Sequence, residues 1–304
     1  MDYSKLFQKK LLLVTGKGGV GKTLVASSLG IEAAKRGKKV CLVESTSEDQ
    51  IGPLLGSGTI GHSLKKVREN LFVTNLHPEL NFRDFIVLHL GFQTLFDKIF
   101  SKDIVRSFVR MIPGIAEITL LGRLYYYCNL ETEHKFDLVI LDGFASGHFL
   151  SLLSTPDAIL NAGFVGPIVK ETKRVRDYIN DNSVCGGVVV CSPEPLVLNE
   201  TIDFIERLSV ISDLSIDALF INRYLGSLKF PEESPLSENR IINQILTKAH
   251  AQKEGLTMFR DTLHSSSKRN PFPHYLMPEF IHFEEPLSDN DLERWFKKGY
   301  QCPP

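Results

Sequence analysis

A glycine-rich stretch near the start of the chain has the residue types and spacing of an anion-binding loop. It reads Gly16-Lys17-Gly18-Gly19-Val20-Gly21-Lys22-Thr23 and follows the apolar run 11–14. Glycines allow a tight turn that brings backbone N–H groups against phosphate oxygens, and the N-terminus of the next helix adds partial positive charge. In the pattern G-x-x-x-x-G-K-[ST], Lys22 reaches the β- and γ-phosphates and the Thr23 hydroxyl coordinates Mg²⁺. We expect nucleotide contacts from Gly16, Gly18, Gly19, Val20, Gly21, Lys22, Thr23 and Leu24.

The same stretch also fits a dinucleotide-binding pattern. Three of its glycines satisfy G-x-G-x-x-G, namely Gly16, Gly18 and Gly21. Glu44 lies roughly 20 residues further on, where a dinucleotide fold places an acid for the ribose. Lys22 and Thr23 favour the phosphate loop, because a dinucleotide fold has no need of a cation and a metal-binding hydroxyl there. ATP is therefore the expected ligand, and a dinucleotide is the alternative.

Length, composition and charge limit the class of protein. The 304 residues are 43% hydrophobic and 23% charged, which is typical of a globular protein. A formal net charge of −1 gives no global attraction to nucleic acid, so we expect no nucleic-acid partner. No apolar run approaches the roughly 20 residues that span a bilayer, and no signal peptide is evident. We therefore expect a cytoplasmic protein that is not an integral membrane protein.

The elements around the loop alternate between strands and helices. Unbroken apolar runs joined by helices predict an α/β fold of the P-loop NTPase type, with a mostly parallel sheet covered on both faces. We expect strands at 11–14, 40–43, 71–74, 136–142, 186–191, 217–221 and 274–277, and helices at 23–36, 156–182, 197–210, 238–254 and 289–298. Residues 1–304 are predicted to form a single domain, with a helical subdomain inserted at about 80–130.

The predicted insertion is rich in phenylalanine. Its phenylalanines recur at helical spacings: Phe82, Phe85, Phe92, Phe96, Phe100 and Phe108. One interpretation is a small satellite core. The other is a hydrophobic surface that holds a client and opens with the nucleotide state. The sequence alone does not separate the two.

Polar residues end several predicted strands, where ligand groups gather in open α/β sheets. Asp142 fits a second Mg²⁺ anchor whose carboxylate holds a metal-bound water. Residues 143–150 are expected to form a glycine-bounded loop that senses the γ-phosphate. Glu44 is expected to face the nucleotide. Asn222 either offers its amide to a purine edge or bonds its own backbone.

These stretches together resemble the ArsA, MinD and ParA group of P-loop ATPases. The phosphate loop, with Lys17 as well as Lys22, is similar to the variant loop of that group. Segment 142–150 is similar to the D-x-A-P-[ST]-G-H-x-L switch of the arsenite-pump ATPase and of its relatives that target tail-anchored membrane proteins. Further matches lie at 113–117, 193–201 and 222–223. The resemblance covers roughly residues 8–225.

The resemblance implies an ATP-driven dimer that uses Mg²⁺. Lys17 would reach the phosphates of the partner, and Lys22 would hold the β- and γ-phosphates. Thr23 and Asp142 would hold the metal. The partner is expected to be a second copy or a paralogue, and the client an unidentified protein that could be membrane-associated. Closure around ATP would reshape the insertion.

The chain departs from the resembled family in several places. Family members carry an acid after the second strand to position the attacking water, and Thr46 stands at the equivalent place. Hydrolysis is therefore expected to be slow, or Glu44, Glu48 or Asp49 substitutes. The alternative function is a non-hydrolysing nucleotide-binding regulator that binds a protein through the insertion. No C-x-x-C or cysteine trio matches the zinc or arsenite sites. The residues expected to carry catalysis are Lys17, Lys22, Glu44 and Asp142.

Overall fold

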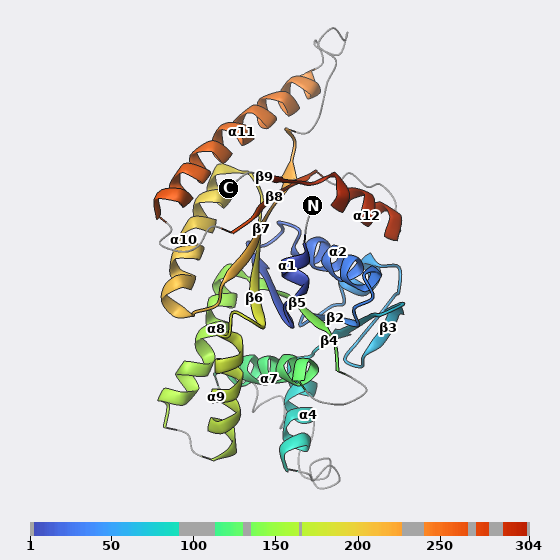
Figure 1. The fold of residues 1–304 in the computed structure, drawn as a ribbon, viewed down its shortest axis with the longest axis vertical. Coiled ribbons are helices and arrows are strands. Elements are labelled where there is room, and N and C mark those ends of the chain that lie inside the picture. Colours follow the sequence, from blue (N-terminus) through green and yellow to red (C-terminus); the bar gives the residue numbers. More distant parts are fainter. Residues whose placement is uncertain are drawn as a thin grey trace.

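The computed structural model describes residues 3–90, 113–129, 135–163, 166–226, 240–266, 272–279 and 288–302. A nine-stranded sheet runs through them in the order β3-β4-β2-β5-β1-β6-β7-β8-β9 (Figure 1). Its strands are β1 (Leu11–Gly16), β2 (Val40–Glu44), β3 (Lys65–Arg68), β4 (Leu71–Asn75), β5 (Leu138–Ala145), β6 (Cys185–Cys191), β7 (Ile216–Tyr224), β8 (His274–Pro278) and β9 (Tyr300–Cys302). All neighbours pair in parallel except the two edge strands, β3 and β9. The predicted α/β fold of the P-loop NTPase type is confirmed.

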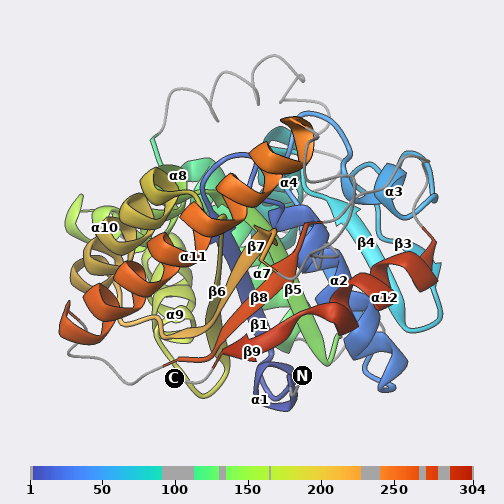
Figure 2. The ribbon, with the colours of Figure 1, turned by 90° about the horizontal axis from the view of Figure 1, so that it is seen from above.

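Helices cover both faces of this sheet (Figure 2). They are α1 (Ser4–Phe7), α2 (Lys22–Lys35), α3 (Ile51–Leu54), α4 (Pro78–Leu90), α7 (Ile115–Asn129), α8 (Ser146–Asn161), α9 (Pro167–Ile179), α10 (Pro195–Ile211), α11 (Arg240–Ser266) and α12 (Asp289–Lys298). One buried cluster joins the sheet to α1, α2 and α12, and the other joins it to α7 through α11. The fold therefore has three layers, with the sheet in the middle.

The central strand β1 shows why the apolar runs do not alternate with polar residues. Leu12 and Val14 pack in the cluster that contains α2 and α12, whereas Leu11 and Leu13 pack in the cluster on the opposite face. Successive residues of a strand face opposite sides of the sheet. A strand covered on both faces must therefore be apolar at every position.

The parallel register brings the ends of three strands to one edge of the sheet. Glu44 at the end of β2 pairs with Asp142 of β5, and Asp142 pairs with Val14 of β1. Gly16, which starts the glycine-rich loop, is the last residue of β1. The strand register alone thus brings two carboxylates and the glycine-rich loop to one edge of the sheet.

Two elements differ from the prediction. Residues 143–150 are not a loop, because β5 continues to Ala145 and α8 begins at Ser146. Gly143 permits this, since a Cβ at that position would lie 2.4 Å from the Val14 carbonyl oxygen on the neighbouring strand. The single helix expected at 156–182 is two helices, α8 and α9. Gly163 and Gly166 have φ values of 78° and 84°, which an α-helix does not allow.

The predicted insertion is described only at its borders. Helices α4 and α7 flank residues 91–112, and Phe92, Phe96, Phe100 and Phe108 lie outside the described residues. Phe82 of α4 is buried in the cluster that contains α7. The borders of the insertion therefore pack on the main core, and its role stays a prediction.

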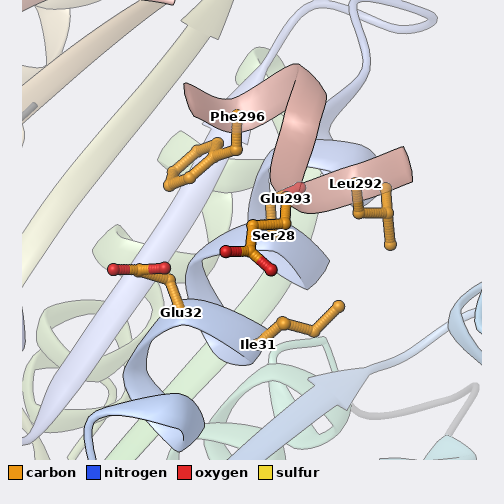
Figure 3. Close-up of a pocket in the computed structure, with 6 residues that line it drawn as sticks. All are labelled: Ser28, Ile31, Glu32, Leu292, Glu293 and Phe296. Atoms are coloured by element: carbon orange, nitrogen blue, oxygen red, sulfur yellow. The ribbon is translucent and has the colours of Figure 1, made fainter. Parts of the chain in front are cut away.

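A pocket lies between α2 and α12, on the opposite face of the sheet from α7 (Figure 3). It is lined by Ser28, Ile31, Glu32, Leu292, Glu293 and Phe296. Glu32 pairs with Arg36, and Glu293 pairs with Lys35 and Lys297. Both carboxylates are thus neutralised from within the chain, and Ser28 is on the order of 9 Å along α2 from Lys22. The ion pair of Lys35 with Glu293 joins α12 to α2, and the pocket is not the site of the phosphate loop.

In the described ranges, no helix is long and apolar enough to span a bilayer.

Candidate functional site

The glycine-rich loop passes between strand ends that leave no room for side chains on its inner side. A Cβ at Gly16 would lie 1.9 Å from the Val190 carbonyl oxygen of β6. Gly21 has a φ of 94°, and a Cβ there would lie 2.3 Å from the Asn222 Nδ2 atom of β7. A Cβ at Gly18 or Gly19 would meet no atom within 4 Å. The loop is therefore packed against the sheet on one side and open to a ligand on the other.

Lys22 begins α2 directly after this loop. Its Nζ atom donates a hydrogen bond to the Lys17 carbonyl oxygen at 3.2 Å, which holds the ammonium group over the loop. Burial lowers the pKa of Lys22 from its ordinary value, and the nearby Asp142 carboxylate opposes that shift. The loop thus places a cation where N–H groups and a helix N-terminus already favour an anion.

Thr23 and Asp142 are joined by a short hydrogen bond. The Thr23 hydroxyl donates to Asp142 Oδ2 at 2.6 Å, across 119 residues of sequence. Asp142 is 8% exposed, and its Oδ1 atom is buried without a hydrogen-bond partner. Burial raises the pKa of Asp142 to about 6, while the Thr23 hydroxyl and the Lys22 charge lower it. The two predicted metal ligands therefore lie together, and one carboxylate oxygen remains available.

Glu44 is fully buried beside Asp142. Its Oε2 atom accepts hydrogen bonds from the backbone N–H groups of Gln50 at 3.0 Å and Ile51 at 3.2 Å. Its Oε1 atom is buried without a partner. Burial raises the pKa of Glu44 to about 7, since the two backbone hydrogen bonds compensate only in part and Asp142 adds like charge. Glu44 thus holds the start of α3 with one oxygen, and its other oxygen has no partner.

The loop between β2 and α3 is held by Asn75 of β4. Asn75 accepts from the Thr46 N–H at 3.1 Å and donates to the Thr46 carbonyl oxygen at 3.1 Å. Asn75 also donates to Asp49 at 2.9 Å, and Asp49 accepts from the N–H groups of Ile60 and Gly61. Burial alone would raise the pKa of Asp49, but these hydrogen bonds together hold it below its ordinary value. The Asp49 carboxylate therefore serves the loop itself.

Sequence reasoning did not single out Gln50, which lies at the open side of this loop. Gln50 is exposed, and its Oε1 atom is 3.3 Å from the Thr23 hydroxyl oxygen. No sequence pattern indicates this contact, because it depends on how Glu44 holds the backbone of residues 50 and 51.

Lys17 points to α10 of the same chain. Its Nζ atom lies 2.6 Å from Glu200 Oε2, and the two side chains are 40% and 44% exposed. An ion pair with this much exposure contributes about 0–1 kcal/mol. Lys17 is therefore held at the surface beside the loop, by a contact weak enough to exchange for another partner.

Asn222 supports the phosphate loop in this structure. Its Nδ2 atom donates to the Val20 carbonyl oxygen at 2.9 Å, and its Oδ1 atom accepts from the Arg223 N–H at 2.8 Å. Arg223 has a φ of 63°, which is uncommon for a residue with a side chain. The backbone-bonding alternative for Asn222 is thus realised, and its contact with a purine stays a prediction. Leu24, in the first turn of α2, packs on the apolar core.

The start of α8 contacts α7. His148 Nε2 lies 3.3 Å from Glu117 Oε1 of α7, and the His148 ring stacks on Phe144 with centroids 4.1 Å apart. The Thr15 hydroxyl of β1 donates to the Phe144 carbonyl oxygen at 3.0 Å. The segment after Asp142 is therefore connected to the strand before the phosphate loop and to the helix that follows residues 91–112.

Comparison with known families agrees with this geometry. A family model described as anion-transporting ATPase matches residues 9–164, more than half of the 304-residue chain. The chain belongs to the anion-transporting ATPase family. The resemblance inferred from the motifs is confirmed, and the matched residues include Lys17, Lys22, Thr23, Glu44 and Asp142.

Individual relatives in this family come from distant organisms. The ATPase BagA of Mycobacterium tuberculosis is 24% identical over 243 residues, which cover 76% of this chain and 69% of the relative. A putative arsenical pump-driving ATPase 2 of Aquifex aeolicus is 25% identical over 239 residues, covering 76% and 73%. The ATPase ASNA1 homolog 2 of Paramecium tetraurelia is 31% identical over 149 residues, covering 49% and 44%. All three of these relatives are named as ATPases.

The buried Glu44 carboxylate makes folding stability depend on pH. Its pKa is about 7 in the folded chain against an ordinary 4.5, so the folded state binds the proton more tightly than the unfolded state does. Its contribution is therefore complete below pH 4.5 and is lost as the pH rises to about 7. Each unit of pKa difference corresponds to about 1.4 kcal/mol, so the free energy of unfolding falls by about 3 kcal/mol over this pH range.

Glu44→Gln is expected to remove this pH dependence, since the amide can still accept from Gln50 and Ile51. Urea unfolding of metal-free protein at pH 5 and pH 8 measures it. We expect the variant to gain stability relative to wild type at the higher pH. Equal pH dependence in both proteins would contradict the account of Glu44.

Proposed function

We propose that this chain binds and hydrolyses ATP with Mg²⁺ and works as a nucleotide-gated switch. The observation that carries the proposal is the pair formed by the Thr23 hydroxyl and Asp142, 2.6 Å apart, next to Lys22 at the open side of the glycine-rich loop. A cation, a metal-binding hydroxyl and a strand-end carboxylate are the parts that phosphoryl transfer from a nucleotide requires. Membership of an ATPase family supports the same function.

The residues present fit Mg²⁺. The metal takes oxygen ligands, keeps several waters, and is held by one or two carboxylates together with substrate phosphates. Asp142 Oδ1 and Glu44 Oε1 are both buried without partners, and they belong to residues paired in register on neighbouring strands. Thr23 would hold the ion directly, and the two free oxygens would accept hydrogen bonds from its waters. When bound, Mg²⁺ neutralises charge on the β- and γ-phosphates.

A dinucleotide is the less favoured ligand because of Glu44. The dinucleotide pattern requires an exposed acid that bonds the ribose hydroxyls. Glu44 has no exposed surface, and one of its oxygens holds the N–H groups of Gln50 and Ile51. The residue that would recognise the ribose is therefore committed to the protein itself.

The proposal includes an ATP-dependent dimer with a second copy or a paralogue. In it, Lys17 leaves Glu200 and reaches the phosphates bound by the partner. The exposed ion pair contributes about 0–1 kcal/mol, so this exchange costs little. A cytoplasmic location and a protein client, which could be membrane-associated, belong to the proposal and rest on the resemblance.

Glu200→Gln is expected to strengthen ATP-dependent dimerisation by up to about fivefold, because it removes the contact that competes for Lys17. Sedimentation velocity with a non-hydrolysable ATP analogue measures the change. Glu206→Gln, an exposed acid on the same helix, is the control and leaves dimerisation unchanged. Weaker association of the Glu200 variant would show that Glu200 itself supports the dimer.

The proposal leaves out transport of arsenite, although some relatives are named as arsenical pump-driving ATPases. Four of the five cysteines are buried: Cys41, Cys128, Cys185 and Cys191. Burial raises the pKa of Cys128 to about 12, which keeps this thiol protonated. Within the described part of the chain, no group of three or more histidine, cysteine or acidic side chains could hold a metal ion. A protein client is therefore proposed in place of a metalloid.

Phosphate release from Mg-ATP by the purified chain tests the proposal. Slow release that stops in EDTA is the expected result. No release with ATP still bound would favour the second candidate, a nucleotide-binding regulator. The observation in favour of that candidate is Thr46, whose hydroxyl donates to the Glu48 carbonyl oxygen at 2.7 Å and provides no acid at the predicted switch position.

A further inference from the structure

Hydrolysis needs a group that orients the attacking water, and five residues between the end of β2 and the start of α3 carry a carboxylate, an amide or a threonine hydroxyl that could supply it. They are Glu44, Thr46, Glu48, Asp49 and Gln50. The sequence left the choice open between Glu44, Glu48 and Asp49. The contacts of each side chain in the structure decide between all five, and this inference rests on the proposed function.

Three of the five are committed to the fold. Glu44 is fully buried and holds the N–H groups of residues 50 and 51. The Thr46 hydroxyl donates to a carbonyl oxygen within the loop at 2.7 Å. Asp49 accepts from Asn75 at 2.9 Å and from the Ile60 N–H at 2.8 Å. Thr46 and Asp49 cannot turn to a bound nucleotide without losing these hydrogen bonds, and the second oxygen of Glu44, which is buried without a partner, is the one proposed above for the waters of the metal.

Of the two that remain, Gln50 contacts the metal-binding residue. Its amide lies 3.3 Å from the Thr23 hydroxyl oxygen, and its backbone N–H is fixed by Glu44 at 3.0 Å. Glu48 is exposed, and its carbonyl oxygen accepts from Thr46. Gln50 is thus anchored through its backbone, and its exposed side-chain amide lies beside the Thr23 hydroxyl.

The number of hydrogens on the Thr23 hydroxyl determines which end of the Gln50 amide faces it. A threonine hydroxyl has one hydrogen. Asp142 accepts it at 2.6 Å, so it is not available for the longer contact with Gln50. The two ends of a glutamine amide are assigned from their partners, so here the NH₂ group faces Thr23 and donates to it. The amide oxygen then faces away from Thr23, where it can accept.

We propose that Gln50 positions the water that attacks the γ-phosphate. In a nucleotide complex Thr23 would hold the metal that neutralises charge on the β- and γ-phosphates, and the γ-phosphate would then lie near the hydroxyl that Gln50 contacts. The NH₂ group would then donate to a phosphate oxygen, and the amide oxygen would accept a hydrogen bond from the water. One neutral side chain thus aligns nucleophile and electrophile.

The step balances without a protein base. The water oxygen forms a bond to the γ-phosphorus, and the bond from phosphorus to the bridging oxygen breaks. ADP leaves with that electron pair. An amide cannot take a proton at neutral pH, so the water proton passes to an oxygen of the departing phosphate. Turnover should therefore be slow, because positioning and not proton abstraction accelerates it.

Gln50→Ala tests this inference because turnover and nucleotide binding can be measured separately in the variant. The expected result is a fall in kcat of about 10²-fold, the size typical for one transition-state hydrogen-bonding group. The Kd of a fluorescent ATP analogue and the Tm stay at the wild-type value, because the backbone N–H still reaches Glu44. Gln50→Glu, which keeps an acceptor of the same length, is expected to recover part of the loss. Ser47→Ala, exposed on the same loop, is the matched control.

The outcomes separate this inference from the function on which it rests. A wild type without phosphate release overturns both. A wild type that turns over, with an unaltered kcat in Gln50→Ala, overturns only the role of Gln50. An equal fall in kcat for Glu48→Gln would assign the water to Glu48. A fall in kcat of Gln50→Ala that matches a loss of ATP binding would also overturn the inference.

Discussion

Lys22→Ala is expected to lower phosphate release from Mg-ATP by about 10³-fold, the upper range for one group that stabilises developing charge. Lys22 places its ammonium over the glycine-rich loop, where Nζ donates to the Lys17 carbonyl oxygen at 3.2 Å. Burial that lowers the pKa of Lys22 also lowers the local dielectric. A charge in such surroundings acts more strongly on phosphate than a charge in water.

Steady-state kinetics with a phosphate-binding fluorescent reporter measures the Lys22→Ala effect. Lys35→Ala is the matched control, because it removes the same group from the other end of α2, where Lys35 pairs with Glu293. The control is expected to keep wild-type turnover. Similar losses in both variants would mean that any damage to α2 stops turnover, and the role of Lys22 would then be unsupported.

Asp142→Asn is expected to lower turnover by about 10²-fold and, at the same time, to stabilise the metal-free protein. Turnover falls because a neutral amide holds metal-bound water less well than the carboxylate that accepts from Thr23 at 2.6 Å. Stability rises because the pKa of Asp142 is about 6 in the folded chain against an ordinary 3.8. At pH 8 that difference amounts to about 3 kcal/mol.

The opposite signs of these two effects identify a functional carboxylate. Asp137→Asn is the control, at the residue just before β5, where Asp137 accepts from the Lys39 N–H at 2.9 Å. Asp137→Asn is expected to lower the free energy of unfolding by about 1 kcal/mol and to leave turnover unchanged. Metal dependence is read from phosphate release across a Mg²⁺ titration. Loss of both stability and turnover in Asp142→Asn would make the residue structural.

The sequence predicts those parts of the site that follow from short motifs or from the general geometry of a parallel sheet. The glycine-rich loop follows from glycine spacing and the Gly-Lys-Thr sequence, which fix a turn within eight residues. Asp142 and Glu44 could be placed because parallel strands bring their carboxyl ends to one edge, and the register Glu44 to Asp142 realises this. The motifs also predicted the family, since several of them had to occur together in the correct order.

Other parts depend on contacts between distant residues. Lys17 and Glu200 are 183 positions apart, and neither position predicts the other. Gln50 reaches Thr23 because the buried Glu44 fixes the loop, which polarity alone does not suggest. The edge strands β3 and β9 were not predicted. Residues 65–68 are charged in three of four positions, and residues 300–302 are too few for a pattern.

One missed boundary did have a signal in the sequence. Gly163 and the pair Gly166-Pro167 separate α8 from α9, and a proline is favourable in the first turn of a helix. The helix predicted over 156–182 runs across this break.

A crystal structure with Mg²⁺ and a non-hydrolysable ATP analogue tests the central claim most directly. The account predicts the triphosphate along the open side of the glycine-rich loop, with Lys22 on the β- and γ-phosphates. It predicts the metal about 2.1 Å from the Thr23 hydroxyl oxygen, with Asp142 on one of its waters. An analogue bound elsewhere, or a metal that Thr23 does not touch, would contradict it.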